Sequence, residues 1–222
     1  MKYGFYFSIL AILLGCVALM WKGLCLLLLW PAASFAVVGL GYLFLGHRVF
    51  GKRTDGTLRL GNMLFLAPFL AFLWSVWHLA RLILREDAYN EVNESIIVGR
   101  RLLSVELPAG VETVVDLTCE FNEPKALRNV SNYIAAPMLD GTALAAEDLV
   151  NLAKRVSKAD GAIYIHCAQG HGRTGTFTAL LLLLTRRASS VEEALAKLQE
   201  ARPAVRISSA QRAVLDSASE LL

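Results

Sequence analysis

The sequence predicts an α/β domain that follows a long apolar N-terminal segment. The chain has 222 residues and is 55% hydrophobic, which is high for one globular domain, and the apolar excess lies before residue 85. After residue 85, short strand-like runs alternate with segments of helical periodicity, a pattern typical of an α/β sheet. We therefore expect a multi-pass transmembrane anchor over residues 1–84 and a folded C-terminal domain over residues 85–222.

Charge divides the chain in the same way. Residues 1–84 contain seven Lys or Arg and one acid, whereas residues 85–222 contain fifteen Lys or Arg and eighteen acids. The net charge of +3 is therefore +6 in the first part and −3 in the second. The basic residues mostly flank apolar runs, where they set membrane topology. Basic residues are not interleaved with aromatic ones in a stripe, so we expect no nucleic-acid partner.

Cysteine usage excludes two classes of small structural site. The four cysteines, Cys16, Cys25, Cys119 and Cys167, form no CxxC pair and lack the Cys/His spacing of a metal site. We expect neither a disulfide framework nor a structural zinc ion, and the sequence implies no metal and no cofactor.

Three apolar runs, at residues 3–21, 24–46 and about 63–80, are each close to the roughly 20 residues that a helix needs to cross a bilayer. A cleaved signal peptide or buried core helices would be the alternatives. The first run lacks a clear small-residue cleavage site, and two long runs follow it, so we expect about three transmembrane helices in an integral plasma or inner membrane protein.

The sequence leaves open on which side of the membrane the C-terminal domain lies. If all three runs cross, the basic loop at residues 47–61 lies opposite the domain, and the positive-inside rule places the domain outside. The cationic residues that follow the third run favour the other side. A hairpin formed by residues 1–46 alone would also change the count.

Four strands and four helices are predicted after the junction at residues 85–94. The strands are expected at residues 95–99, 113–117, 133–137 and 162–166, and the helices at residues 144–158, 174–187, 190–200 and 208–221. Ser190 with Glu193, and Ser208 with Gln211, have the spacing of capping boxes that begin the last two helices.

The segment HCAQGHGRTG, residues 166–175, carries the strongest chemical signal. An apolar strand precedes it and a helix follows, so residues 167–173 form a loop where backbone amides and a helix N-terminus favour an anion. Gly170, Gly172 and Gly175 let the backbone curl. The same positive field favours the nucleophilic thiolate of Cys167, and the Arg173 guanidinium matches two phosphate oxygens.

The segment resembles the active-site signature of the cysteine-dependent protein tyrosine phosphatase superfamily. In that signature, His precedes a Cys, five residues separate the Cys from an Arg, and Ser or Thr follows. The resemblance covers most of residues 95–222 and includes VVDLTCE (114–120), YIAAPMLD (133–140) and ARP (201–203). The compact size is similar to the dual-specificity branch. It implies a three-layer phosphatase fold with a short, mostly parallel central sheet.

The resemblance also implies a role for each matching residue. Cys167 matches the nucleophile that forms a phosphocysteine intermediate, and Arg173 matches the residue that binds the transferred phosphoryl group. Thr174 matches the hydroxyl that hydrogen-bonds the departing thiolate, His166 the residue that orients the loop, and Asp140 the general acid. The residues implied to bind phosphate are Ala168, Gln169, Gly170, His171, Gly172 and Arg173.

Two further positions are interpreted structurally. Gln211 lies where some relatives position water, but its place as a helix cap accounts for it. Cys119 is best interpreted as a core residue at a strand end, and the alternative that the resemblance offers is a regulatory disulfide with Cys167.

The substrate class stays open at this stage. The superfamily's phosphoinositide 3-phosphatase has two lysines where Ala168 and His171 stand here, which argues against a highly anionic inositol lipid. A membrane-anchored phosphoprotein phosphatase is the leading hypothesis, and a phosphatase of a simpler lipid such as phosphatidylglycerophosphate is the alternative. A non-catalytic phosphate-binding adaptor would be expected to lack Cys167, Arg173 or Asp140, and a sulfurtransferase fits the flanking residues poorly.

Overall fold

The computed structural model describes residues 2–222 and divides into two compact units. The first, here called the helical unit, is Met1–Arg53, Thr57–Glu86 and Cys119–Asn122. The second, here called the sheet unit, is Thr54–Gly56, Asp87–Thr118 and Glu123–Leu222. Each unit therefore includes one short segment that is flanked in the sequence by residues of the other unit: Cys119–Asn122 in the helical unit and Thr54–Gly56 in the sheet unit.

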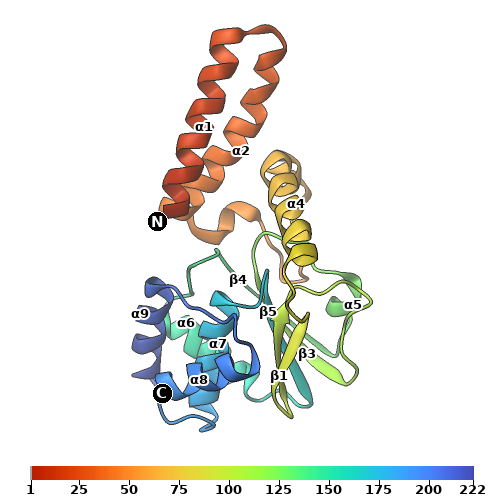
Figure 1. Cartoon of the computed structure of the whole chain (residues 1–222), viewed down its shortest axis with the longest axis vertical. Coiled ribbons are helices and arrows are strands. Elements are labelled where there is room, and N and C mark those ends of the chain that lie inside the picture. The colour runs from red at the N-terminus through yellow and green to blue at the C-terminus, as the bar shows by residue number, and fades with distance from the viewer. Residues whose placement is uncertain (1) are drawn as a thin grey trace. The chain divides into compact units, whose positions relative to one another are not determined.

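The helical unit is built on an antiparallel hairpin of α1 and α2 (Figure 1). Its elements are α1 Lys2–Trp21, η1 Gly23–Leu28, α2 Leu29–Leu40, η2 Gly41–Leu45, η3 Gly46–Phe50, α3 Leu60–Phe65 and α4 Ala67–Ile83. Small residues let the two long helices approach closely, since a Cβ added at Gly39 would lie 2.6 Å from the Ser8 Oγ. Lys22 and Gly23, both with positive φ, make the tight turn.

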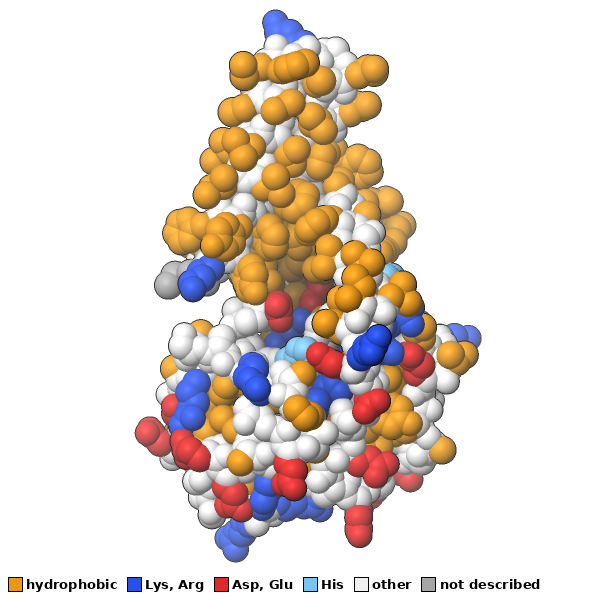
Figure 2. Space-filling model, in the orientation of Figure 1, with side chains coloured by type: hydrophobic (Ala, Val, Ile, Leu, Met, Phe, Trp, Pro, Cys, Tyr) orange, Lys and Arg blue, Asp and Glu red, His pale blue; other side chains and the backbone are white. Residues whose placement is uncertain are grey.

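Two helical segments of the described chain, Lys2–Trp21 and Gly23–Phe50, are long and apolar enough to cross a bilayer. The expectation of about three such helices is wrong. The third apolar run is divided between α3 and α4, and α4 has only 17 residues. Apolar side chains cover the outside of the hairpin (Figure 2), among them Ile12, Leu13 and Leu27, which are exposed.

The sheet unit contains a five-stranded sheet with strand order β1-β2-β5-β3-β4. The strands are β1 Tyr89–Asn93, β2 Ile96–Arg100, β3 Val111–Thr118, β4 Asn132–Met138 and β5 Ala162–Cys167. Within this sheet β1 pairs antiparallel with β2, whereas β2 and β3 flank β5 in parallel register. The mostly parallel sheet predicted from the sequence is thus confirmed, with one antiparallel strand added at its edge.

The two faces of the sheet are covered unequally. One face carries α6 Ala146–Val156, α7 Gly172–Leu184, α8 Val191–Ala201 and α9 Ser209–Ser219. The other face packs under α5 Lys125–Arg128 and loops, around a smaller core that includes Tyr164 and Leu127. α7 is buried over most of its length because it lies between the sheet and the other helices, which explains its continuous apolar sequence.

Candidate active site

The Cys167 loop lies at the carboxyl edge of the parallel strands. Cys167 is the last residue of the central strand β5, and α7 begins five residues later at Gly172. The Gly170 amide donates a hydrogen bond to the Cys167 Sγ at 3.2 Å. The loop therefore turns a backbone N–H toward the sulfur, an arrangement that stabilises negative charge on it.

Two glycines of this loop are closely packed, and one of them is required by its backbone conformation. Gly170 has a φ of +75°, and a Cβ there would lie 2.3 Å from the backbone carbon of Gly99 in β2. A Cβ at Gly172 would lie 2.7 Å from the Gln211 side chain of α9. Gly170 therefore excludes a larger residue, whereas a side chain at position 172 would require the Gln211 side chain to move.

Arg202 fixes the outer side of the loop. Its buried guanidinium donates to the Gln169 carbonyl at 3.0 Å and to the Gly170 carbonyl at 3.2 Å. The same side chain donates to the Asn90 Oδ1 at 2.7 Å, which ties the loop to β1. The ARP segment (201–203) noted in the sequence contains Arg202, but its contacts with the carbonyls of the Cys167 loop appear only in the structure.

Arg173 is almost fully buried at the start of α7. Its side chain donates to the Met138 carbonyl at 2.9 Å, at the end of β4, and one guanidinium nitrogen lies 3.5 Å from the Asp140 Oδ1. The Asp140 side chain is 58% exposed. The structure thus places Arg173 and Asp140 side by side, with the guanidinium fixed and the carboxylate open to solvent.

His166 lies in a buried charged cluster directly before Cys167. Its Nε2 is 3.7 Å from the Glu123 Oε1 and 4.0 Å from the Asp116 Oδ1, and its ring stacks on Tyr164 at 5.4 Å between centroids. Arg101 lies 3.3 Å from the second oxygen of Glu123. Glu123 carries no motif in the sequence, and only the fold brings it to His166.

Asp116 and Tyr133 complete this cluster from β3 and β4. The Tyr133 hydroxyl donates to the Asp116 Oδ2 at 2.6 Å. Burial, together with the neighbouring Asp116 carboxylate, raises the pKa of Tyr133 above its ordinary range, so the phenol stays protonated and remains a donor. The three ligand-type atoms of Asp116, Glu123 and His166 lie within 4.8 Å of one another, and Arg101 supplies a cation beside them.

The loop that carries Asp140 is bonded to the N-terminus of α9. Ser208 and Gln211 form the full capping box predicted from the sequence. In addition, the Ser208 hydroxyl donates to the Gly141 carbonyl at 2.9 Å, and the Gln211 amide donates to the Thr142 carbonyl at 2.9 Å. Ser190 caps α8 by accepting from the Glu193 amide, but the Glu193 carboxylate bonds Ser189, so that box is only half formed.

The remaining predicted site residues lie within the Cys167 loop or in the first turn of α7. Ala168, Gln169 and His171 are partly exposed, and the His171 carbonyl accepts the first helical hydrogen bond of α7. Thr174 is buried, and its hydroxyl has no hydrogen-bond partner within residues 2–222. Cys119 is a buried thiol whose Sγ contacts the Glu120 carboxylate at 3.3 Å.

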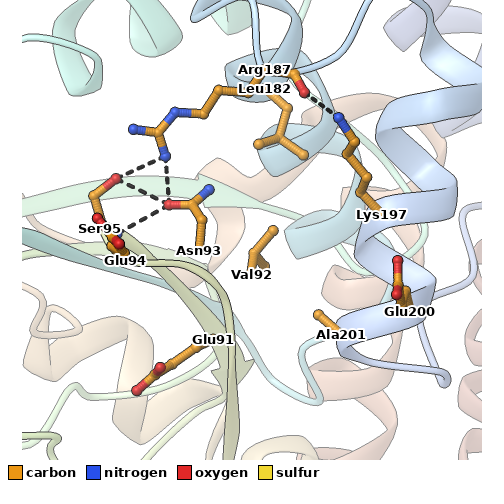
Figure 3. Close-up of a pocket in the computed structure, with 10 residues that line it drawn as sticks. All are labelled: Glu91, Val92, Asn93, Glu94, Ser95, Leu182, Arg187, Lys197, Glu200 and Ala201. Atoms are coloured by element: carbon orange, nitrogen blue, oxygen red, sulfur yellow. Dashed lines mark hydrogen bonds between the residues drawn. The ribbon is translucent and has the colours of Figure 1, made fainter.

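A separate hollow of about 890 Å³ lies at the opposite, amino edge of the sheet (Figure 3). It is lined by the β1–β2 turn and by residues of α7 and α8. Its two cations already bond protein oxygens, because Arg187 donates to the Ser95 Oγ and Lys197 donates to the Arg187 carbonyl. This hollow contains no residue of the Cys167 loop and is not part of the candidate site.

Comparison with known proteins agrees with this geometry. The family model described as PTP-SAK, Swiss Army Knife protein, DSP-PTPase phosphatase domain, matches residues 100–220. The solved structure of Tk-PTP in the active form is 25% identical, covers 61% of this chain and 98% of its own, and has a TM-score of 0.53. No match was found among curated protein sequences.

Two further solved structures share the fold. PTPMT1 in complex with PI(5)P is 19% identical and covers 61% of this chain and 96% of its own, with a TM-score of 0.52. Human DUSP28 is 18% identical and covers 60% of this chain and 96% of its own, with a TM-score of 0.50.

Proposed function

Because this chain belongs to the DSP-PTPase family and contains a cysteine-dependent phosphatase-like hydrolase domain, we propose that it is a membrane-anchored phosphoprotein phosphatase. The observation that carries the proposal is the Gly170 amide on the Cys167 sulfur, beside the buried guanidinium of Arg173. Its substrates are then phosphotyrosine, phosphoserine or phosphothreonine side chains, and the α1–α2 hairpin is the anchor.

The proposed reaction has two steps. In the first, the Cys167 thiolate attacks phosphorus, the ester P–O bond breaks, and Asp140 donates a proton to the leaving oxygen. In the second, the Asp140 carboxylate takes a proton from water, the water oxygen attacks the phosphocysteine, and the thiolate leaves. Arg173 and the loop amides bind the equatorial oxygens throughout, and the Thr174 hydroxyl donates to the departing thiolate.

A lipid phosphate monoester is the second candidate substrate. PTPMT1, which shares the fold, has been solved with PI(5)P, and an anchored enzyme of this chain would work near lipid headgroups. Against a highly anionic headgroup, the exposed loop positions here are Ala168, Gln169 and His171, without a lysine or arginine among them. A phosphatidylglycerophosphate-like lipid therefore fits better than a polyphosphorylated inositol.

The two substrate classes are separated by assaying the full-length protein in detergent micelles. The substrates are a phosphotyrosine peptide, a phosphothreonine peptide, phosphatidylglycerophosphate and PI(5)P, with Cys167→Ser as the blank. We expect the highest kcat/KM on one of the peptides. Turnover confined to a lipid would replace the phosphoprotein assignment by the lipid one, and no Cys167-dependent turnover on any substrate would contradict the enzymatic proposal.

Ser208→Ala is expected to lower kcat about fivefold, because it removes the hydrogen bond that holds the Gly141 carbonyl next to Asp140. One such bond is worth about 1 kcal/mol, which corresponds to that factor in rate. Asp140→Asn should itself lower kcat about 100-fold or more. If Ser208 affects the rate only by positioning Asp140, the double variant Ser208→Ala/Asp140→Asn has the same kcat as Asp140→Asn alone.

Ser190→Ala is the matched control for Ser208→Ala. Both serines are helix N-caps, so both variants should lose about 1 kcal/mol of stability, measured as a lower Tm. Only Ser208 donates a hydrogen bond to the Asp140 loop. An equal fall in kcat for the two variants would show that Ser208 contributes stability alone.

A further inference from the structure

The third apolar run of the helical unit begins and ends at the same place. Before the run, the Lys52 Nζ donates to the Phe121 carbonyl and the Leu58 amide donates to the Asn122 Oδ1 at 2.7 Å. Within it, the Trp74 indole donates to the Glu120 carbonyl at 3.0 Å, and the Trp77 ring lies 5.6 Å from the Phe121 ring. Residues 52, 58, 74 and 77 therefore all contact one short segment, Cys119–Asn122.

Four residues extend over no more than about 14 Å, whereas the hydrocarbon core of a bilayer is about 30 Å thick. Leu58 and Trp74 consequently cannot lie on opposite sides of a membrane. α3 runs away from the segment Cys119–Asn122 and ends at Phe65, whose carbonyl accepts a hydrogen bond from the Trp30 indole at 3.0 Å. α4 then runs back to the same segment, where Trp74 and Trp77 contact it. The third apolar run thus turns back instead of crossing.

Three residues of the basic loop before this run, Thr54–Gly56, belong to the sheet unit. In that unit, the Glu123 amide donates to the Gly56 carbonyl at 2.9 Å, and Arg128 donates to the Asp55 carbonyl at 3.5 Å. The loop after the second apolar helix is therefore on the same side of a membrane as the strands and the Cys167 loop.

We propose that, within residues 2–222, α1 and the α2 segment make two crossings and α3–α4 is re-entrant, so that the start of α1, the basic loop and the phosphatase domain share one side of the membrane, and that this side is the cytoplasm. This assignment rests on the proposed membrane anchor. Among the basic residues before residue 85, only Lys22 then lies at the far tip. The residues on the domain side are Lys2, Arg48, Lys52, Arg53, Arg59 and Arg81. The positive-inside rule places the side with six cations in the cytoplasm.

The surface of α4 fits this position. Phe72, Val76, Leu79 and Ile83 are exposed, and their spacing of three or four residues puts them on one face of the helix. Trp77 is buried on the other side, against Phe121. An apolar face on a helix with Arg81 in its last turn suits the interface between lipid and water. The Cys167 site then acts on phosphate esters of the cytoplasmic side, in proteins or in the inner leaflet.

The test uses single reporter cysteines in the full-length chain, with Cys16 and Cys25 changed to alanine. Leu24→Cys reports the hairpin tip, Thr54→Cys the basic loop, and Leu222→Cys the phosphatase domain; all three positions are exposed. Intact cells and inside-out vesicles are treated with a membrane-impermeant maleimide, and the chain without a reporter gives the background from the two buried cysteines. We expect labelling at position 24 only in intact cells, and at positions 54 and 222 only in inside-out vesicles.

Other patterns overturn particular parts of the proposal. Labelling of positions 54 and 222 from opposite sides would mean that the third run crosses. Labelling of both from outside, with position 24 inside, would reverse the orientation. If alkaline carbonate released the protein into the soluble fraction, the proposal of a membrane anchor would be contradicted. Phosphatase activity is measured on the same samples and tests the enzymatic proposal separately.

Discussion

Cys167→Ser is expected to lower kcat/KM at least about 10⁴-fold on every phosphate ester that the protein hydrolyses. The serine keeps the size of the side chain and its contact with the Gly170 amide, but a hydroxyl is a far weaker nucleophile than a thiolate in this loop. The measurement is steady-state hydrolysis, with binding of inorganic phosphate to the variant as evidence that the loop is intact.

Cys119→Ser is the matched control, because Cys119 is also buried and directly follows the neighbouring strand β3. We expect this variant to keep most of its activity under reducing conditions. Activity of Cys167→Ser within about tenfold of the unmodified protein would place the nucleophile elsewhere. Peroxide inactivation that a thiol reductant reverses in the unmodified protein but not in Cys119→Ser would support the regulatory disulfide that the family resemblance offers.

Arg173→Lys is expected to lower kcat about 1,000-fold, although the positive charge is kept. The Arg173 side chain is buried, and its planar fork donates to the Met138 carbonyl while it stays next to Asp140. An ammonium group cannot bind two phosphate oxygens in the same bidentate way, and cationic groups at this point of phosphoryl transfer are worth about 10³ to 10⁵ in rate.

Arg212→Lys, on the exposed side of α9, is the control for Arg173→Lys. It shows whether replacing a guanidinium by an ammonium group away from the site affects kcat. Arg212 forms surface ion pairs with Asp216 and Glu192, so its replacement should leave kcat unchanged. For Arg173→Lys, phosphate affinity should fall along with kcat, while far-ultraviolet circular dichroism stays native. A loss of less than about tenfold would show that Arg173 is mainly structural.

The strand and the helix on either side of the Cys167 loop could be predicted because both are buried on all sides and are therefore continuously apolar. The run at residues 162–165 lies in the buried β5, and the apolar helix that follows the loop is α7. The polar sequence YNEVN predicts a junction, but it forms β1, an edge strand that is nowhere fully buried. α5, a helix of only four residues, is too short to give a periodic signal.

The residues that the sequence does not indicate are those that act across long separations. Glu123 meets His166, and Arg202 meets Gly170, only after the sheet has formed. Glu123 has no local pattern, and the ARP segment that contains Arg202 does not say which atoms its guanidinium contacts. Hydropathy predicts a membrane crossing for the third apolar run because it counts apolar residues and does not detect a point at which the chain reverses its direction. The chain instead breaks the run at Leu66, and Pro68 stands in the first turn of the helix that returns.

The segment Cys119–Asn122 also has a consequence for biosynthesis. Its partners Lys52, Trp74 and Trp77 are translated some 40 to 70 residues before it, and the Cys167 loop follows later still. During synthesis the helices therefore leave the ribosome before the phosphatase domain has all of its strands. The connection between β3 and Glu123 then forms on partners that have already been made, so a change that misfolds the early helices is expected to disturb this connection before the catalytic loop folds.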